Sequence, residues 1–124
     1  SAIDLNSMHK KEAYFWRGYS KYKIGDYKGS ISDYTSAIDL NSMHKKSQYY
    51  WRGLSKYKIG DFKGAVSDYT SAIDLNSMHK KEAYFWRGES KRRLNNKRGA
   101  CKDYRESELL GSERAKYIHG RLRC

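Results

Sequence analysis

The sequence of 124 residues contains no proline and only two cysteines. Leucine, isoleucine, valine and phenylalanine are also scarce, because together they fill 19 positions. With a formal charge of +12, this composition is typical of intrinsically disordered chains. Twelve tyrosines and three tryptophans oppose that interpretation, because each large aromatic side chain buries roughly 150–250 Å². We therefore expect a folded chain, and the lack of proline and of frequent turn residues favours helices.

Several classes of protein are excluded by what is missing. No run approaches the ~20 apolar residues of a membrane span, and the N-terminus lacks a secretory signal pattern, so we expect no membrane association and a cytoplasmic location. Cys101 and Cys124 are too few for a disulfide scaffold or a metal site. Cys101 takes the place of Ile31 and Val66 in equivalent segments, so we interpret it as a small buried hydrophobic residue.

An internal repeat determines the expected architecture. Residues 1–11 recur at 36–46 and again at 71–81, a fixed period of 35 residues. Residues 71–88 copy residues 1–18 without change, after which the third copy diverges. Such a period is typical of arrays in which each repeat packs against its neighbours. The near-identity of the copies indicates either recent duplication or deliberate amplification.

Each repeat carries the pattern of two helices. Apolar spacing predicts the first helix from about Met8 to Ile24, and Gly25 suits a left-handed C-terminal cap. Asp26 then suits the N-cap of a second helix from about Tyr27 to Leu40. The third copy has two asparagines in place of this Gly-Asp pair, and asparagine tolerates both roles, so we expect the turn to survive.

The positions that define these helices recur in register three times. In the first repeat they read Tyr14-x-x-Arg17-Gly18, Gly25-Asp26-Tyr27, Asp33-Tyr34 and Ala37-Ile38. This series resembles the tetratricopeptide repeat, in its bacterial variety with Arg-Gly in the first helix and Asp-Tyr in the second. The resemblance covers about residues 1–110. It implies an all-α fold, a right-handed superhelical solenoid of antiparallel helix hairpins.

We expect a single domain of three hairpins closed by a C-terminal capping helix. Ser112 suits the N-cap of that last helix, and Ala115, Ile118 and Leu122 fall on one face, which would cover the third hairpin. The opposite end lacks such a cover, which predicts self-association through the N-terminal face. The expected limits are 1–7 for the end of a preceding second helix, 8–41, 42–76 and 77–110 for the hairpins, and 111–124 for the capping helix.

The charged residues depart from the family pattern. Lys21 and Lys56 replace a packing tyrosine, and an arginine takes the place of a core apolar residue in each repeat. Each such arginine is matched by an aspartate sixteen positions later. Because an unpaired arginine at that depth is costly, we predict partly buried, hydrogen-bonded ion pairs. The pairs are Arg17–Asp33, Arg52–Asp68 and Arg87–Asp103.

Groups that could support catalysis or bind metal are sparse. His9, His44 and His79 are copies of one position beside two lysines, and no carboxylate recurs near them at triad or metal spacing. We interpret them as solvated surface residues. No glycine-rich phosphate loop or zinc motif is present. The sequence therefore predicts no enzyme, no catalytic or metal site and no cofactor.

The aromatic residues of the first helices form the candidate binding site. At 100° per residue they gather on the side away from the arginine, and the family uses that face, the concave groove, for ligands. The three tryptophans, Trp16, Trp51 and Trp86, lie at its edge and either line the groove or pack between neighbouring helices. The predicted peptide-binding groove consists of Phe15, Tyr19, Tyr22, Lys23, Tyr50, Leu54, Tyr57, Lys58, Phe85 and Arg92.

A protein or peptide partner is the favoured function. The family's carboxylate clamp uses asparagines in first helices, and here those positions hold Trp16, Trp51, Tyr19 and Leu54. We therefore expect a peptide with apolar or aromatic anchors and acidic flanks. Stacking aromatics beside basic residues also suit single-stranded nucleic acid. A third alternative is an engineered or excised array without a native ligand.

Overall fold

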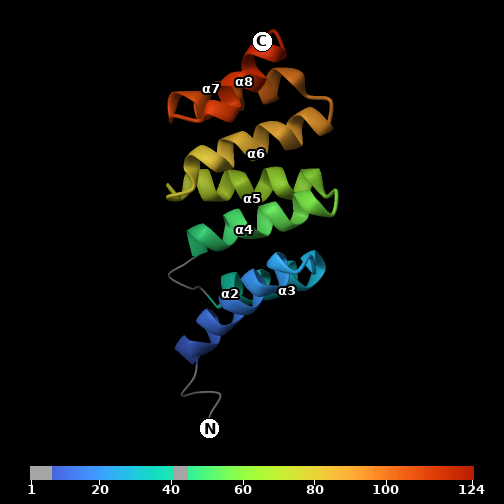
Figure 1. Cartoon of the computed structure of the whole chain (residues 1–124). Coiled ribbons are helices and arrows are strands. Elements are labelled where there is room, and N and C mark those ends of the chain that lie inside the picture. The colour runs from blue at the N-terminus through green and yellow to red at the C-terminus, as the bar shows by residue number, and fades with distance from the viewer. Residues whose placement is uncertain (1–6, 41–44) are drawn as a thin grey trace.

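The computed structural model describes residues 7–40 and 45–124, with the side chains of residues 7–9 and 11 excepted. In these ranges the chain is helical, and no strand occurs among the described residues. Figure 1 shows the helices piled from the N-terminus to the C-terminus in chain order. The helices are α2 (Ser7–Lys23), α3 (Tyr27–Asp39), α4 (Lys45–Lys58), α5 (Phe62–Asp74), α6 (Lys80–Arg93), α7 (Lys97–Leu109) and α8 (Glu113–Arg121).

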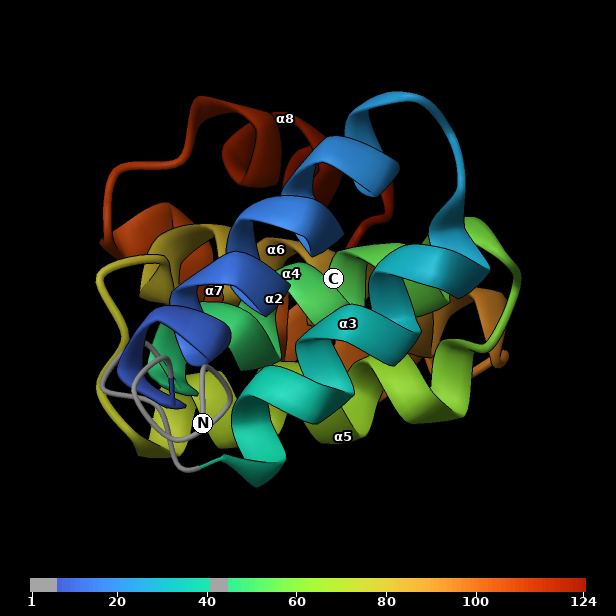
Figure 2. The same cartoon turned by 90° about the horizontal axis from the view of Figure 1, so that it is seen from below.

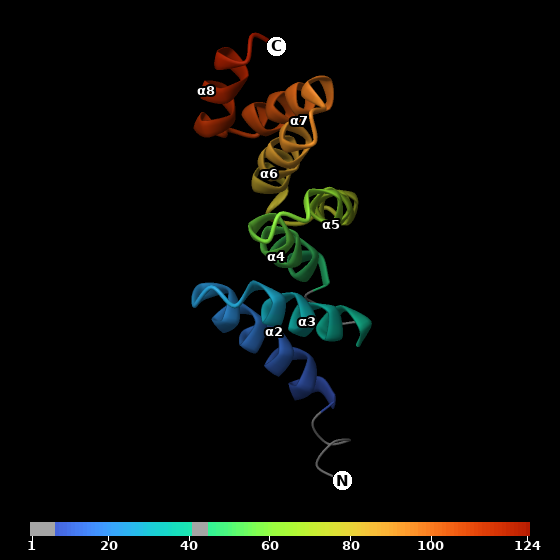
Figure 3. The ribbon, with the colours of Figure 1, turned by 90° about the vertical axis from the view of Figure 1, so that its right-hand side faces the viewer.

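Consecutive helices pair into hairpins, α2 with α3, α4 with α5 and α6 with α7, and each hairpin packs on the next through α3–α4 and α5–α6 contacts. Figure 3 shows α4 and α6 on one side of the stack and α5 and α7 on the other. We call α2, α4 and α6 the A helices and α3, α5 and α7 the B helices. Seen along the stack, α2 lies in front of α4 and α6, and α3 in front of α5 (Figure 2). This all-α repeat solenoid confirms the predicted fold class.

The hairpin turns form as the sequence predicts. Gly25 has a φ of 88°, in the left-handed region, and the side chain of Asp26 accepts a hydrogen bond from the Gly29 amide at 3.0 Å. In the third hairpin Asn95 adopts the same region with a φ of 63°, and Asn96 caps α7. Asparagine therefore replaces both residues of the Gly-Asp turn without changing its geometry.

The core of each hairpin is a tyrosine of the B helix packed against a glycine of the A helix. Tyr34, Tyr69 and Tyr104 are fully buried. A Cβ atom placed on Gly53 would lie 2.8 Å from Cε1 of Tyr69, closer than packed carbon atoms approach one another. The glycine of the Arg-Gly pair is therefore a steric requirement of the packing.

Gly53→Ala is expected to lower the free energy of unfolding by about 1–3 kcal/mol, because the new methyl group overpacks the buried Tyr69 ring. Gly120 lies in α8 with open space around its Cα. There, the same change is expected to raise the free energy by about 0.5–1 kcal/mol through helix propensity. Urea denaturation measures both values. Effects of equal sign at the two glycines would contradict this account of the core.

Gln48 interrupts the apolar packing at the start of α4. It takes the place of Ala13 and Ala83, is fully buried, and neither polar atom of its amide has a hydrogen-bond partner in the described part of the chain. An unpaired buried group of this kind costs about 1–3 kcal/mol. Gln48→Met removes the polar atoms at similar volume, so we expect a higher urea midpoint with an unchanged slope. A lower midpoint would show that the amide is satisfied in solution.

The capping helix α8 closes the C-terminal end of the stack. Ser112 accepts a hydrogen bond from the Ala115 amide at 3.1 Å, Ala115 is fully buried, and Ile118 and Leu122 pack against the third hairpin. These contacts confirm the predicted cap and its face. None of the helices in residues 7–40 and 45–124 has the length and apolar character of a membrane span.

A disulfide joins Cys101 on α7 to Cys124 after α8. The interpretation of Cys101 as a small buried hydrophobic residue is therefore wrong, because the residue is half-buried and its sulfur is bonded to Cys124. The reason is topological, because α8 packs back on α7 and brings the residue 23 positions later beside it. A second α7–α8 contact pairs His119 Nδ1 with Glu108 at 3.2 Å.

Candidate functional site

In each hairpin an arginine and a lysine of the A helix pair with one aspartate of the B helix, and we call this group the ion-pair bracket. Arg52 donates from Nε and Nη2 to the two carboxylate oxygens of Asp68 at 2.8 and 2.7 Å, and Lys56 Nζ lies 3.1 Å from the same carboxylate. The predicted arginine–aspartate pairs are confirmed in all three repeats. Sequence reasoning missed the lysine, although a lysine follows the arginine by four residues in every repeat.

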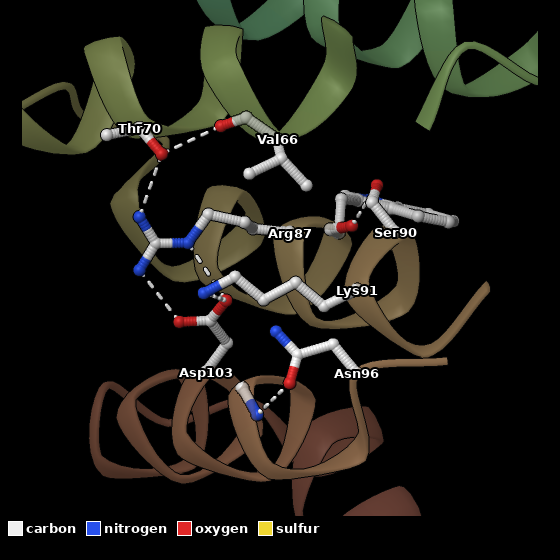
Figure 4. Close-up of polar contacts among 9 residues, drawn as sticks. Val66, Thr70, Arg87, Ser90, Lys91, Asn96 and Asp103 are labelled. Atoms are coloured by element: carbon white, nitrogen blue, oxygen red, sulfur yellow. Dashed lines mark hydrogen bonds and ion pairs between the residues drawn. The ribbon is translucent and has the colours of Figure 1, made fainter. Parts of the chain in front are cut away.

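The bracket also joins one repeat to the next. Arg87 donates from Nη1 to Thr70 Oγ1 at 3.0 Å, and Thr70 belongs to the preceding B helix (Figure 4). Arg52 makes the same contact with Thr35 at 3.1 Å. One guanidinium group therefore ties three helices, because it joins its own A helix to the preceding B helix and to the B helix of its own hairpin.

In the first repeat, burial alone would raise the pKa of Asp33. The hydrogen bonds from Arg17 and Lys21 outweigh burial and hold that pKa below its ordinary value. In the folded chain the Asp33 carboxylate is therefore ionised and paired with Arg17 and Lys21.

Aromatic side chains run along the face that the A helices share, which we call the A face. Tyr22 packs edge-on against Trp51 with ring centroids 5.6 Å apart, and Tyr57 packs against Trp86 in the equivalent contact at 5.2 Å. Trp51 and Trp86 are half-buried and pack between consecutive A helices. Trp16 has no preceding A helix in the described part of the chain and is 62% exposed. For Trp51 and Trp86 the alternative is thus inter-repeat packing, whereas Trp16 stays exposed on the A face.

Three residues assigned to the groove lie in the core. Tyr50, Leu54 and Phe85 are only 5%, 6% and 6% exposed, so the expectation that they are open to a ligand is wrong. The His79 ring stacks on Tyr50 with centroids 4.6 Å apart and planes 13° apart, and the Arg114 guanidinium lies 4.5 Å from the Phe85 centroid. The next repeat therefore covers the ring of Tyr50, and the capping helix α8 covers the ring of Phe85.

The other predicted groove residues are half-buried or exposed. Tyr19, Tyr22 and Tyr57 are half-buried on the A face, with Lys23 and Lys58 exposed beside them. Phe15 is half-buried against Trp16 and Tyr34, and Arg92 is half-buried and hydrogen-bonded to Glu89.

His79 and Arg114 are positions that sequence reasoning missed. The interpretation of His79 as a solvated residue is wrong, because its ring is half-buried and stacks on Tyr50. This burial lowers the pKa of its imidazole. His9 and His44, the other two copies, lie outside the described side chains. The repeat register could have identified them as equivalent positions, since Arg114 follows His79 by one period of 35 residues.

The stability of the fold should depend on pH through His79. Its pKa in the folded chain lies below the ordinary value of 6.5, so unfolding takes up a proton below that pH. The free energy of unfolding is therefore expected to fall as the pH drops from 7 through 6.5 and to level off below the folded pKa. His79→Phe keeps the stacked ring and should remove this part of the slope. Identical slopes for the two proteins between pH 7.5 and 5 would exclude His79 as the cause.

The A face ends in two adjacent cavities between α6 and α8. One, of about 350 Å³, is lined by residues that include Lys81, Trp86 and Ser112. The other, of about 470 Å³, is lined by residues that include Tyr117 and Ile118. Both are bordered by Phe85, Glu113 and Arg114.

Glu89, at the edge of the second cavity, already has partners. It accepts hydrogen bonds from Arg92 at 3.1 Å and from the Tyr104 hydroxyl. The corresponding hydroxyls of Tyr34 and Tyr69 are buried without a partner in the described part of the chain. Burial raises the pKa of Tyr104, with the bond to Glu89 adding to the effect.

Comparison with known proteins supports the family suggested by the sequence. Models of the tetratricopeptide repeat match residues 11–42 and residues 82–106. No curated protein sequence matches the chain.

Several solved structures share the fold over nearly its whole length. The tetratricopeptide repeat domain of Arabidopsis OM64 is 28% identical, with a TM-score of 0.85 over 94% of this chain and 97% of that one. The first such domain of Spaghetti (RPAP3), bound to the HSP90 peptide SRMEEVD, is 24% identical, with a TM-score of 0.83 over 92% and 90%. The second domain of human RPAP3, in complex with the HSP70 peptide SGPTIEEVD, is 23% identical, with a TM-score of 0.83 over 95% and 98%.

Together with the stacked hairpins, these matches show that the chain is a tetratricopeptide repeat protein.

Proposed function

We propose that the A face binds a peptide through aromatic or apolar anchors, with acidic flanks. The observation that carries the proposal is the set of half-buried tyrosines and tryptophans that continues from α2 to α6 with Lys23, Lys58 and Arg93 exposed beside it. Partly exposed aromatic residues of this kind provide large contact areas at interfaces. The RPAP3 domains of the same fold are in complex with peptides.

The chemistry of the face favours a ligand different from those peptides. Trp16, Tyr19, Trp51 and Leu54 stand where a clamp for a C-terminal carboxylate would need asparagine. Tyr19 and Trp51 instead pack edge-on with centroids 5.2 Å apart. We therefore expect SRMEEVD to bind more weakly than a peptide of equal length with tryptophan and leucine anchors.

Single-stranded nucleic acid is the second candidate. It is favoured by the net charge of +12 and by Lys23, whose ammonium lies 5.2 Å from the Tyr19 ring centroid. A cation beside a stacking ring is the arrangement that such grooves use. The two candidates differ in salt dependence, because affinity for phosphates falls steeply with ionic strength.

The discriminating experiment compares a displayed peptide library with a thymidine oligonucleotide at 50 and 200 mM salt. We expect peptide hits whose affinity falls less steeply over this range than oligonucleotide binding, for which roughly 10³–10⁵-fold is typical at 6–10 phosphate contacts. Tyr19→Ala should weaken the hits. Tyr14→Ala is the matched control, since Tyr14 lies beside Arg17. Tight oligonucleotide binding with a steep salt slope and no peptide hit would favour nucleic acid over a peptide as the ligand. Binding to neither would favour an array without a native ligand.

A further inference from the structure

We infer that Arg114 of the capping helix anchors an acidic side chain of the bound peptide. The inference rests on the proposed function and extends it, because it names one recognition element and locates it at the α8 end of the A face. Arg114 belongs to neither the A helices nor the predicted groove.

The geometry of Arg114 leaves its donors available. Its guanidinium lies 4.5 Å from the Phe85 ring centroid and 5.1 Å from that of Trp86. The residue is exposed, and it has no ion pair or hydrogen bond in the described part of the chain. A guanidinium over an aromatic face is held by the ring and can still donate two parallel hydrogen bonds to a carboxylate.

The surrounding charges favour an acid as the ligand group. Of the carboxylates that border the cavities, Glu89 is hydrogen-bonded to Arg92 and Tyr104, and Glu82 lies 4.0 Å from Lys81. Glu113 alone has no partner among the described residues. The chain as a whole carries a formal charge of +12, which attracts an acidic segment before contact.

The two cavities beside Arg114 match a particular ligand pattern. They share Phe85, Glu113 and Arg114 as a common border, so Arg114 stands between openings of about 350 and 470 Å³. The larger opening is walled by Tyr117 and Ile118, which are largely apolar. A peptide with an acidic residue between two apolar residues could place its carboxylate on Arg114 and its neighbours in the two cavities.

The position of Arg114 is fixed before any ligand arrives. The Cys101–Cys124 disulfide and the His119–Glu108 pair hold α8 on α7, so less order is lost when the guanidinium is engaged. The equivalent residue one repeat earlier, His79, is half-buried and favours its neutral form. Of these two equivalent positions, only the one in α8 therefore carries a cation over an aromatic ring, which would give the bound peptide a direction.

The test uses a synthetic probe, acetyl-GSYLWELYSG-amide, and two variants with glutamine or lysine in place of its glutamate. Binding to the full chain and to Arg114→Gln is measured at low and high salt by the fluorescence anisotropy of a dye on the probe. The dye is needed because both the probe and the protein contain tryptophan. For the glutamate probe, Arg114→Gln should reduce affinity about tenfold or more, the effect of a hydrogen bond to a charged group. The glutamine probe should bind both proteins equally. Arg105→Gln, on the exposed surface of α7, is the matched control.

Each other outcome overturns the inference. Equal losses for the glutamate and glutamine probes would assign Arg114 a packing role, and stronger binding of the lysine probe to Arg114→Gln would assign the site to a cation held by Glu113. If Tyr19→Ala weakens the glutamate probe while Arg114→Gln does not, the anchor fails and the proposed function stands. If no probe binds the unmodified chain, both fail. Circular dichroism of each variant verifies the fold.

Discussion

Replacing Asp68 with alanine is expected to lower the free energy of unfolding by about 3–5 kcal/mol, whereas the same change at Asp33 should cost much less. Asp68 is almost fully buried and accepts from Arg52 while Lys56 adds a second charge. The Arg52 side chain is only 15% exposed, against 59% for Arg17, the partner of Asp33. Removing Asp68 therefore leaves a buried cation unpaired, while Arg17 can turn into water. Urea denaturation gives both values.

A double variant tests whether the cost of Asp68→Ala comes from leaving Arg52 unpaired. Arg52→Leu combined with Asp68→Ala removes both charges of the pair, leaves Lys56 as the remaining charge, and restores an apolar residue at the arginine position, so it should recover part of the lost stability. Equal, small costs for Asp68→Ala and Asp33→Ala would show that the brackets contribute little to the fold.

Reduction of the Cys101–Cys124 disulfide is expected to lower the free energy of unfolding by about 3 kcal/mol, the value typical of loops of this length. The loss should be concentrated in α8, a short helix held mainly by Ile118, Leu122 and the fully buried Ala115. Amide hydrogen exchange with and without a phosphine reductant measures it, with Cys124→Ser as the variant that should no longer respond. Unchanged protection of α8 after reduction would contradict the assigned role of the disulfide.

The disulfide also bears on where the protein works. Disulfides persist in oxidising compartments and are rare in the cytosol, so the state of Cys101 and Cys124 in cells would test the cytoplasmic location, which stays a prediction. Self-association through the N-terminal face stays a prediction as well.

The elements that depend on local chemistry could be predicted from the sequence. Gly25-Asp26 ends one helix and begins the next because of backbone conformation and a single capping bond, and both are encoded within a few residues. The Arg52–Asp68 pair was also accessible, because a charged residue at a core position requires a partner and an aspartate follows the arginine by sixteen positions in every repeat.

The depth of the aromatic residues could not be predicted in the same way. A helical wheel gives the direction in which Tyr50 and Phe85 point, but their exposure depends on how far the next repeat reaches over them. His79 and Arg114, which cover these rings, are polar and follow a turn, so no apolar pattern marks them as packing residues. The burial of Tyr50 and Phe85 therefore leaves the half-buried Tyr19, Tyr22 and Tyr57 as aromatic groove residues of the A face.

The central claim, that the A face is the binding surface, is tested most directly by the three tryptophan indole N–H signals in a nitrogen-15 NMR titration. With the acetyl-GSYLWELYSG-amide probe, the signals of Trp51 and Trp86 should shift and saturate together with those of α8, while amides of the B helices α3 and α5 stay in place. Saturable shifts confined to the B helices, with all three indole signals unmoved, would contradict the account.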